Sequence, residues 1–106
     1  MGLLHIYLAN NTYDLQRVTS PPPLDEISRL VGGTPEVVYA LLKSKKCQMF
    51  INADGESLEF PVNVRAMKLY NAWLKSEGKT DPAPIRGNAV VLDGMTMETS
   101  WLEEDD

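Results

Sequence analysis

The sequence predicts an α+β fold, in which a small mixed or mostly antiparallel sheet carries two helices in the order β-β-α-β-β-β-α-β. Short runs of alternating apolar and polar residues, bounded by turn residues, predict the strands. Two segments with apolar residues at helical spacing predict the helices. The 106 residues suffice for one core and are too few for two, so we expect a single sheet with both helices on one side of it.

The chain begins with a predicted hairpin. In residues 3–9, Leu4, Ile6 and Leu8 alternate with a second set that is also partly apolar, which is typical of a central strand. Residues 10–12 have turn composition, since asparagine tolerates positive φ and bonds its own backbone. Residues 13–18 alternate again and form the predicted return strand.

A first helix is predicted over residues 24–31, after three prolines that cannot pair in a sheet. Gly32 and Gly33 follow it and suit a left-handed helix C-cap. Phosphate-binding loops run from a strand through glycines to a helix N-terminus. The opposite order found here favours a cap over a phosphate site.

The middle of the chain predicts a second hairpin. Residues 36–42 are compatible with strand or helix, and their β-branched start favours strand. Residues 47–52 have strand character, residues 52–55 form a tight turn in which Gly55 supplies positive φ, and residues 57–60 form the return strand.

A second helix and a last strand complete the domain. Asn63 suits a helix N-cap, and Gly78 ends the helix predicted over residues 64–77. Its apolar stripe, which we interpret as core rather than as a binding surface, contains Ala66, Met67, Tyr70, Trp73 and Leu74. Residues 85–92 are the last predicted strand.

The formal net charge of −5 comes from the C-terminal end. Glu98 and residues 103–106 are acidic, and without them ten acids balance ten Lys and Arg. A DNA mimic spreads carboxylates over a folded face, so this distribution argues against mimicry. We predict a single domain over residues 1–95 and an acidic tail over residues 96–106, which either forms a short helix or extends freely.

The tail also contains the candidate partner-binding residues. An apolar anchor among carboxylates is typical of a peptide-like docking segment. The alternative is that the tryptophan folds back onto the body of the domain, because large aromatic side chains prefer burial. The residues concerned are Trp101, Leu102, Glu103 and Glu104.

One basic cluster stands out in the sequence. Lys43, Lys45 and Lys46 are candidate nucleic-acid contacts. Three lysines in a predicted turn are more often a solvated loop, so nucleic acid is the less favoured partner.

Few residues are available for catalysis or metal binding. One cysteine, Cys47, and one histidine, His5, exclude an intramolecular disulfide and a Cys/His zinc site within one chain. Spacing identifies no partner that would make His5 a general base, and we interpret Cys47 as a half-buried strand residue although two lysines precede it. Asn52, Asp54 and Glu56 imitate the start of a calcium loop, but a hairpin turn explains them better. We therefore predict no catalytic residues, no metal and no cofactor.

The chain carries no predicted membrane segment or signal peptide. No apolar run approaches the roughly 20 residues of a membrane helix, and the N-terminus has no basic region before its apolar stretch. These observations predict a cytoplasmic protein that does not contact membranes.

A set of motifs in fixed order resembles a known family. These are a helix ending in residues 30–33, the apolar residues 37–39, the turn at 50–56, the helix start at 60–66 and the strand at 85–92. The set is similar to the small domains of unknown function catalogued as family 3846, from phages, plasmids and bacteria. The match covers residues 24–94 and departs from the family pattern at Ala53 and Asp54 and in the acidic tail. The resemblance implies the fold and a prokaryotic or mobile-element setting, and it brings no catalytic residues.

Together, these features predict a small accessory protein that is not an enzyme and acts by binding another protein. A nucleic-acid-associated protein using the lysine cluster is the alternative. A homodimer is compatible with the sequence, since a small sheet with an uncovered edge gains burial by pairing with itself.

Overall fold

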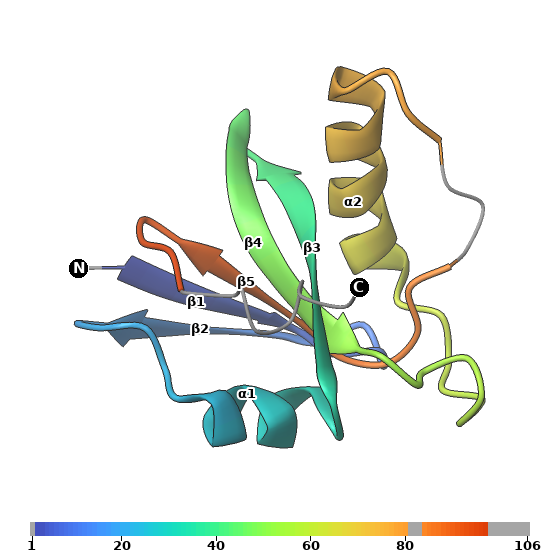
Figure 1. Ribbon diagram of the computed structural model, residues 1–106, viewed down its shortest axis with the longest axis horizontal. Helices are drawn as coiled ribbons and strands as arrows, with labels where there is room; N and C mark the ends of the chain where they lie inside the picture. The colour runs from blue at the N-terminus through green and yellow to red at the C-terminus, as the bar shows by residue number, and fades with distance from the viewer. Residues whose placement is uncertain (1, 81–83, 98–106) are drawn as a thin grey trace, which may run out of the picture.

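The computed structural model describes residues 2–80 and 84–97. Five strands form one antiparallel sheet in the order β2-β1-β5-β4-β3, accompanied by two helices (Figure 1). The elements are β1 (Gly2–Tyr7), β2 (Tyr13–Val18), α1 (Leu24–Val31), β3 (Pro35–Leu42), β4 (Lys45–Asn52), α2 (Val64–Ser76) and β5 (Ala89–Asp93). The predicted α+β class is confirmed, and the predicted order of elements holds except for one strand discussed below.

The first hairpin is confirmed. β1 pairs with β2 from Gly2 opposite Val18 to Tyr7 opposite Tyr13. The N–H of Leu8 donates to the Thr12 carbonyl at 2.9 Å and closes the turn, in which Asn11 has a φ of 76°. β1 also pairs with β5, so it is an internal strand, as its two apolar faces indicate.

The second predicted hairpin is wrong, and the strands pair differently. β4 pairs with β3 through a two-residue turn in which Lys43 and Ser44 both have positive φ, at 51° and 67°. Residues 57–60 form no strand: residues 53–59 form consecutive turns, in which Leu58 N–H donates to the Asp54 carbonyl. Residues 36–42 are indeed extended, and their full register with β4 holds the turn in place without asparagine or glycine.

The helix α1 spans the predicted residues 24–31, and α2 begins at the predicted residue and ends one residue earlier than predicted, at Ser76. Gly32 adopts a left-handed conformation with φ of 84° and caps α1, its N–H donating to the Ser28 carbonyl. The Asn63 side chain caps α2 by accepting a hydrogen bond from the Ala66 N–H at 3.1 Å. The predicted last strand is shorter than expected: β5 begins at Ala89, and Arg86 makes only an isolated bridge with Val62.

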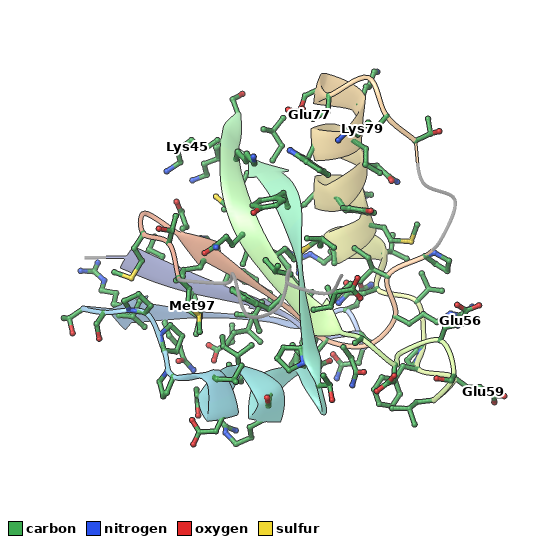
Figure 2. The ribbon with its side chains drawn as sticks, viewed as in Figure 1. Lys45, Glu56, Glu59, Glu77, Lys79 and Met97 are labelled. Atoms are coloured by element: carbon green, nitrogen blue, oxygen red, sulfur yellow. The ribbon has the colours of Figure 1, made fainter. Side chains whose placement is uncertain are left out.

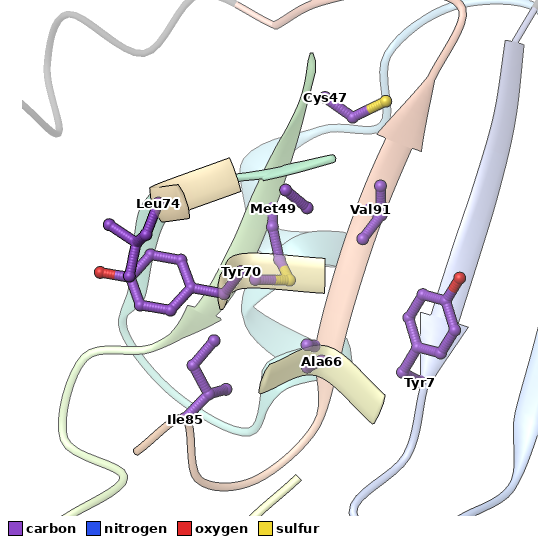
Figure 3. Close-up of a cluster of buried hydrophobic side chains, with 10 residues drawn as sticks. Tyr7, Cys47, Met49, Ala66, Tyr70, Leu74, Ile85 and Val91 are labelled. Carbon is purple, nitrogen blue, oxygen red and sulfur yellow. The ribbon is translucent and has the colours of Figure 1, made fainter. Parts of the chain in front are cut away.

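The two helices lie on opposite faces of the sheet, which corrects the prediction that they share one side. Side chains of successive strand residues point to opposite faces, and here both sets are buried. The α2 face holds Tyr7, Ala40, Cys47, Met49, Ala66, Tyr70, Leu74, Ile85, Ala89 and Val91 (Figure 3). The α1 face holds Leu4, Ile6, Ile27, Val31, Phe50, Val90 and Leu92. The central strands therefore need a cover on each side.

The chain after β5 returns along the α1 face. Met95 and Met97 pack against the buried cluster on that side, where Met97 lies near α1 (Figure 2). The Gln48 side-chain amide holds the backbone of Met97 by two hydrogen bonds, accepting from its N–H at 2.7 Å and donating to its carbonyl at 2.9 Å.

Candidate functional site

A row of hydrogen-bonded polar side chains crosses the α2 face of the sheet. The Lys45 ammonium donates to one oxygen of Asp93 at 2.9 Å, and His5 Nε2 lies 3.2 Å from the other oxygen. His5 Nδ1 lies 2.8 Å from the Tyr13 hydroxyl. These residues come from β4, β5, β1 and β2, which are neighbours in the sheet. We call Tyr13, His5, Asp93 and Lys45 the polar row.

The polar row has a carboxylate at its centre. The hydrogen bond from Lys45 holds the pKa of Asp93 below its usual value, and the hydrogen bond from His5 acts in the same direction, against the effect of partial burial. The same contact raises the pKa of Lys45. A single neutral tautomer of His5 fits both of its contacts, with Nε2–H donating to Asp93 and Nδ1 accepting from Tyr13. The carboxylate is therefore held ionised between two donors.

Aromatic rings and an arginine border the row. The Tyr7 and Tyr13 rings lie 5.1 Å apart, and the Arg65 guanidinium lies 5.4 Å from the first ring centroid and 5.2 Å from the second. Burial raises the pKa of Tyr7. A shallow depression of about 240 Å³ beside the rings is lined by Tyr7, Arg65, Lys68 and Leu69. Arg65 thus joins the start of α2 to the β1–β2 hairpin.

The helix α2 covers only half of its face of the sheet. It packs mainly against β3 and shares a buried cluster with Cys47 and Met49 of β4, whereas β1 and β2 extend away from it (Figure 1). On β2, Tyr13 is 40% exposed and Leu15 is 46% exposed, and Arg17 is also exposed. Their register with β1 places all three on the same side as His5. We call Tyr13, Leu15 and Arg17, with Arg65 at their border, the open face.

The charges of the body are segregated, although they sum to nearly zero. Arg65, Lys68 and Lys75 lie on α2, and residues 64–76 contain no acid. In β1, β2 and β5, the acid on the α2 side is Asp93, because Asp14 points to the other side. Figure 2 shows Glu56 and Glu59 in the 53–59 turns, far from Lys45. The open face is therefore cationic.

The lysine cluster does not form one bare patch. Lys43 lies in the β3–β4 turn, Lys45 pairs with Asp93, and the Lys46 ammonium lies 4.4 Å from the centroid of the Tyr39 ring. Two of the three lysines thus have partners within the domain.

The two reactive residue types of the sequence are enclosed. His5 is 8% exposed, and both ring nitrogens have hydrogen-bond partners. Cys47 is buried, and burial followed by the nearby Asp93 charge raises the pKa of its thiol. This direction is the reverse of what the preceding lysines suggest, because Lys45 contributes less than burial does.

The remaining candidates have structural roles. The Asn52 amide donates to the Val31 carbonyl and its oxygen accepts from the Asp54 N–H, so it joins α1 to the turn after β4. On α2, Tyr70 is buried and Met67 and Trp73 pack against the core, as predicted. Within residues 2–80 and 84–97, no three His, Cys, Asp or Glu side chains gather as a metal site would require. The predicted docking residues Trp101, Leu102, Glu103 and Glu104 lie outside the described residues.

No family model, curated protein or solved structure matches the chain. In the part of the chain that the structure describes, neither helix is long and apolar enough to cross a membrane.

Sequence reasoning found His5 but missed its partners. Those partners are Asp93 at the end of β5 and Tyr13 at the start of β2. They meet His5 because β1 pairs with both β2 and β5. The second pairing joins residues about 90 positions apart, and nothing in the local pattern of either strand indicates it.

Proposed function

We propose that the protein is a small non-catalytic accessory protein, from a prokaryote or one of its mobile elements, that acts in the cytoplasm by binding other proteins through the open face. The mobile-element setting rests on the resemblance to family 3846. The proposal that it is not an enzyme is supported by the enclosure of His5 and Cys47, which leaves neither side chain free to meet a substrate.

The observation that carries the proposal is the incomplete cover of the α2 face. Tyr13 and Leu15 expose apolar surface beside Arg17 and Arg65. Tyrosine and arginine are enriched at protein interfaces, where their large side chains contribute much of the binding energy. Because the cations of this face exceed its carboxylates, the fitting partner presents acidic groups around an apolar side chain.

Charge reversal at the border of the open face tests the proposal. Arg65→Glu and Arg29→Glu change the net charge equally, but Arg29 lies on α1 and pairs with Glu26, away from the open face. In affinity capture from a nuclease-treated bacterial lysate, we expect a stoichiometric partner to be retained by the wild type and by Arg29→Glu and lost by Arg65→Glu. Identical capture by all three proteins would contradict the proposal. A chain truncated after residue 97 tests the predicted contribution of Trp101 in the same assay.

Single-stranded nucleic acid is a second candidate partner. The neighbouring rings of Tyr7 and Tyr13, tilted by 39° to each other, and the Arg65 guanidinium near both provide the two features that such proteins use on a sheet, an aromatic surface and a cation. Tyr7 is buried, however, and Lys45 and Lys46 already have partners, which makes this candidate weaker. Salt-sensitive binding of a labelled oligothymidylate or oligouridylate that Arg65→Glu abolishes would support it. No binding at 50 mM salt, chosen as a low ionic strength, would remove it.

A further inference from the structure

The strand β2 is an edge strand of the described sheet, and its outward backbone groups are not paired with another strand. Ladder hydrogen bonds alternate along an antiparallel strand. Thr12 is hydrogen-bonded to Leu8, so the next residue along the strand, Tyr13, directs its N–H and C=O groups away from β1. The same holds for Leu15 and Arg17, because the direction alternates from residue to residue. The Leu15 N–H accordingly has no bond to β1 and donates to the Asp14 carboxylate at 3.0 Å.

The two edges of the sheet differ. β3, at the other edge, packs against both helices. β2 packs mainly against β1, and its first five residues are exposed. An exposed edge strand with apolar side chains is a template for pairing with another strand.

Among two-fold axes centred on residues 14–17, one register suits the pairing of β2 with a second copy of itself. A two-fold axis normal to the sheet keeps each face on its own side, so only residues of the same face can be opposite each other. Centring the axis on Asp14 or Arg17 sets like charges opposite each other, which destabilises a pair. Centring it on Gln16 places Leu15 opposite Arg17 of the second copy. Centring it on Leu15 sets leucine against leucine, Tyr13 against Arg17 of the second copy, and Asp14 against Gln16 of the second copy.

We propose that the chain forms a two-fold dimer through antiparallel pairing of β2 with β2, centred on Leu15. In this register the outward backbone groups of Tyr13, Leu15 and Arg17 meet each other across the axis. The pairing doubles the five-stranded sheet, and the open faces of the two copies join on one side between the two α2 helices. This inference deepens the proposed function by naming one partner, and its test is independent of any other partner.

The interface is small. A six-residue strand is about 20 Å long. Stable complexes bury about 1,200–2,000 Å² of accessible surface in total, and pairing along one such strand buries less. We therefore expect a dimer in equilibrium with monomer at micromolar concentrations.

Sedimentation equilibrium on matched variants tests the interface. Leu15→Lys sets two ammonium groups across the axis and should raise the dimer dissociation constant by about tenfold or more. Gln16→Lys adds the same charge to the same exposed strand but faces Asp14 of the second copy, so dimerisation should persist. A monomer at every concentration up to the solubility limit overturns the proposal, and so does an equal effect of both substitutions. Circular dichroism confirms that both variants fold.

Cross-linking tests the register. Residues directly opposite in a hydrogen-bonded pair have Cα atoms about 5.5 Å apart, within the range of a disulfide. Leu15→Cys should therefore form a covalent dimer with oxidised glutathione. In Arg17→Cys the two introduced thiols start about 13 Å apart along the strands and should not join. Native Cys47 is buried and does not compete. Cross-linking of Arg17→Cys in preference to Leu15→Cys overturns the proposed register.

The two proposals fail separately. If the chain is monomeric but Arg65→Glu still loses a captured partner, only the dimer is wrong. If the dimer forms and no partner depends on Arg65, only the wider proposed function is wrong.

Discussion

The Asn63 side chain does more than cap a helix, and replacing it with aspartate separates its two roles. Its oxygen accepts from the Ala66 N–H, while its amide nitrogen donates to the Tyr7 and Gly87 carbonyls, each at 2.9 Å. The residue is 2% exposed. It therefore ties together the end of β1, the segment before β5 and the start of α2.

Asn63→Asp keeps the cap, because aspartate and asparagine are equally good at this position. It removes both donors and leaves two carbonyl oxygens without them in the interior. Each buried acceptor without a partner costs about 1–3 kcal/mol. We expect a loss of about 3 kcal/mol in the free energy of unfolding, which lowers Tm by about 12–24 °C for a domain of this size.

Thermal and urea unfolding, followed by circular dichroism and Trp fluorescence, measure the effect. Asn63→Ala is the companion variant, since it removes the cap and both donors but buries no carboxylate against the two carbonyl oxygens. Both variants should be less stable than wild type by about 3 kcal/mol or more. A stability of Asn63→Asp within about 0.5 kcal/mol of wild type would refute the argument and reduce the residue to a simple cap.

Three further predictions concern single positions. Two donors lower the pKa of Asp93, so its ionised form stabilises the fold above the unfolded pKa of about 3.9, and this stabilisation is lost as the pH falls through the folded value. The free energy of unfolding, measured with urea, should therefore fall less for Asp93→Asn than for wild type between pH 6 and pH 2. Equal decreases in the two proteins would contradict this. Gly87 and Gly32 have similar positive φ angles, 87° and 84°. A Cβ added at Gly87 would lie 2.7 Å from the Phe60 ring, whereas a Cβ added at Gly32 would have no neighbouring atom closer than 3.9 Å. Gly32→Ala should cost about 1 kcal/mol and Gly87→Ala about 2–3 kcal/mol in thermal unfolding; the reverse order would count against the contact. Cys47 is buried with a raised thiol pKa, so it should react with an aromatic disulfide reagent only when urea unfolds the chain, and rapid labelling in buffer would disprove this.

Local signals predicted the parts of the fold that depend on a few neighbouring residues. Gly32 ends α1 and Asn63 begins α2 because a left-handed cap and a side-chain acceptor are needed there whatever surrounds them. The turn at Lys43 and Ser44 escaped prediction because neither residue is typical of positive φ. It forms because eight residues of β3 are in register with β4, and that pairing outweighs the local preference.

Tertiary arrangement was harder to predict than local structure. Met49 and Phe50 are successive buried residues, as are Val90 and Val91, and such pairs indicate a strand covered on both faces. That signal could have placed the helices on opposite sides. The meeting of His5 with Asp93 carries no such signal, because it depends on which strand lies next to β1.

The position of β5 in the sheet sets the order in which the chain can fold. The hairpins β1–β2 and β3–β4 do not pair with each other, and β5 joins them by pairing with β1 on one side and β4 on the other. During synthesis each hairpin emerges from the ribosome with one inner edge unpaired, and the sheet cannot close until Ala89–Asp93 has followed. Closure over such sequence distances is slow compared with hairpin formation. The nascent chain therefore exposes β1 and β4 to wrong strand partners until β5 arrives.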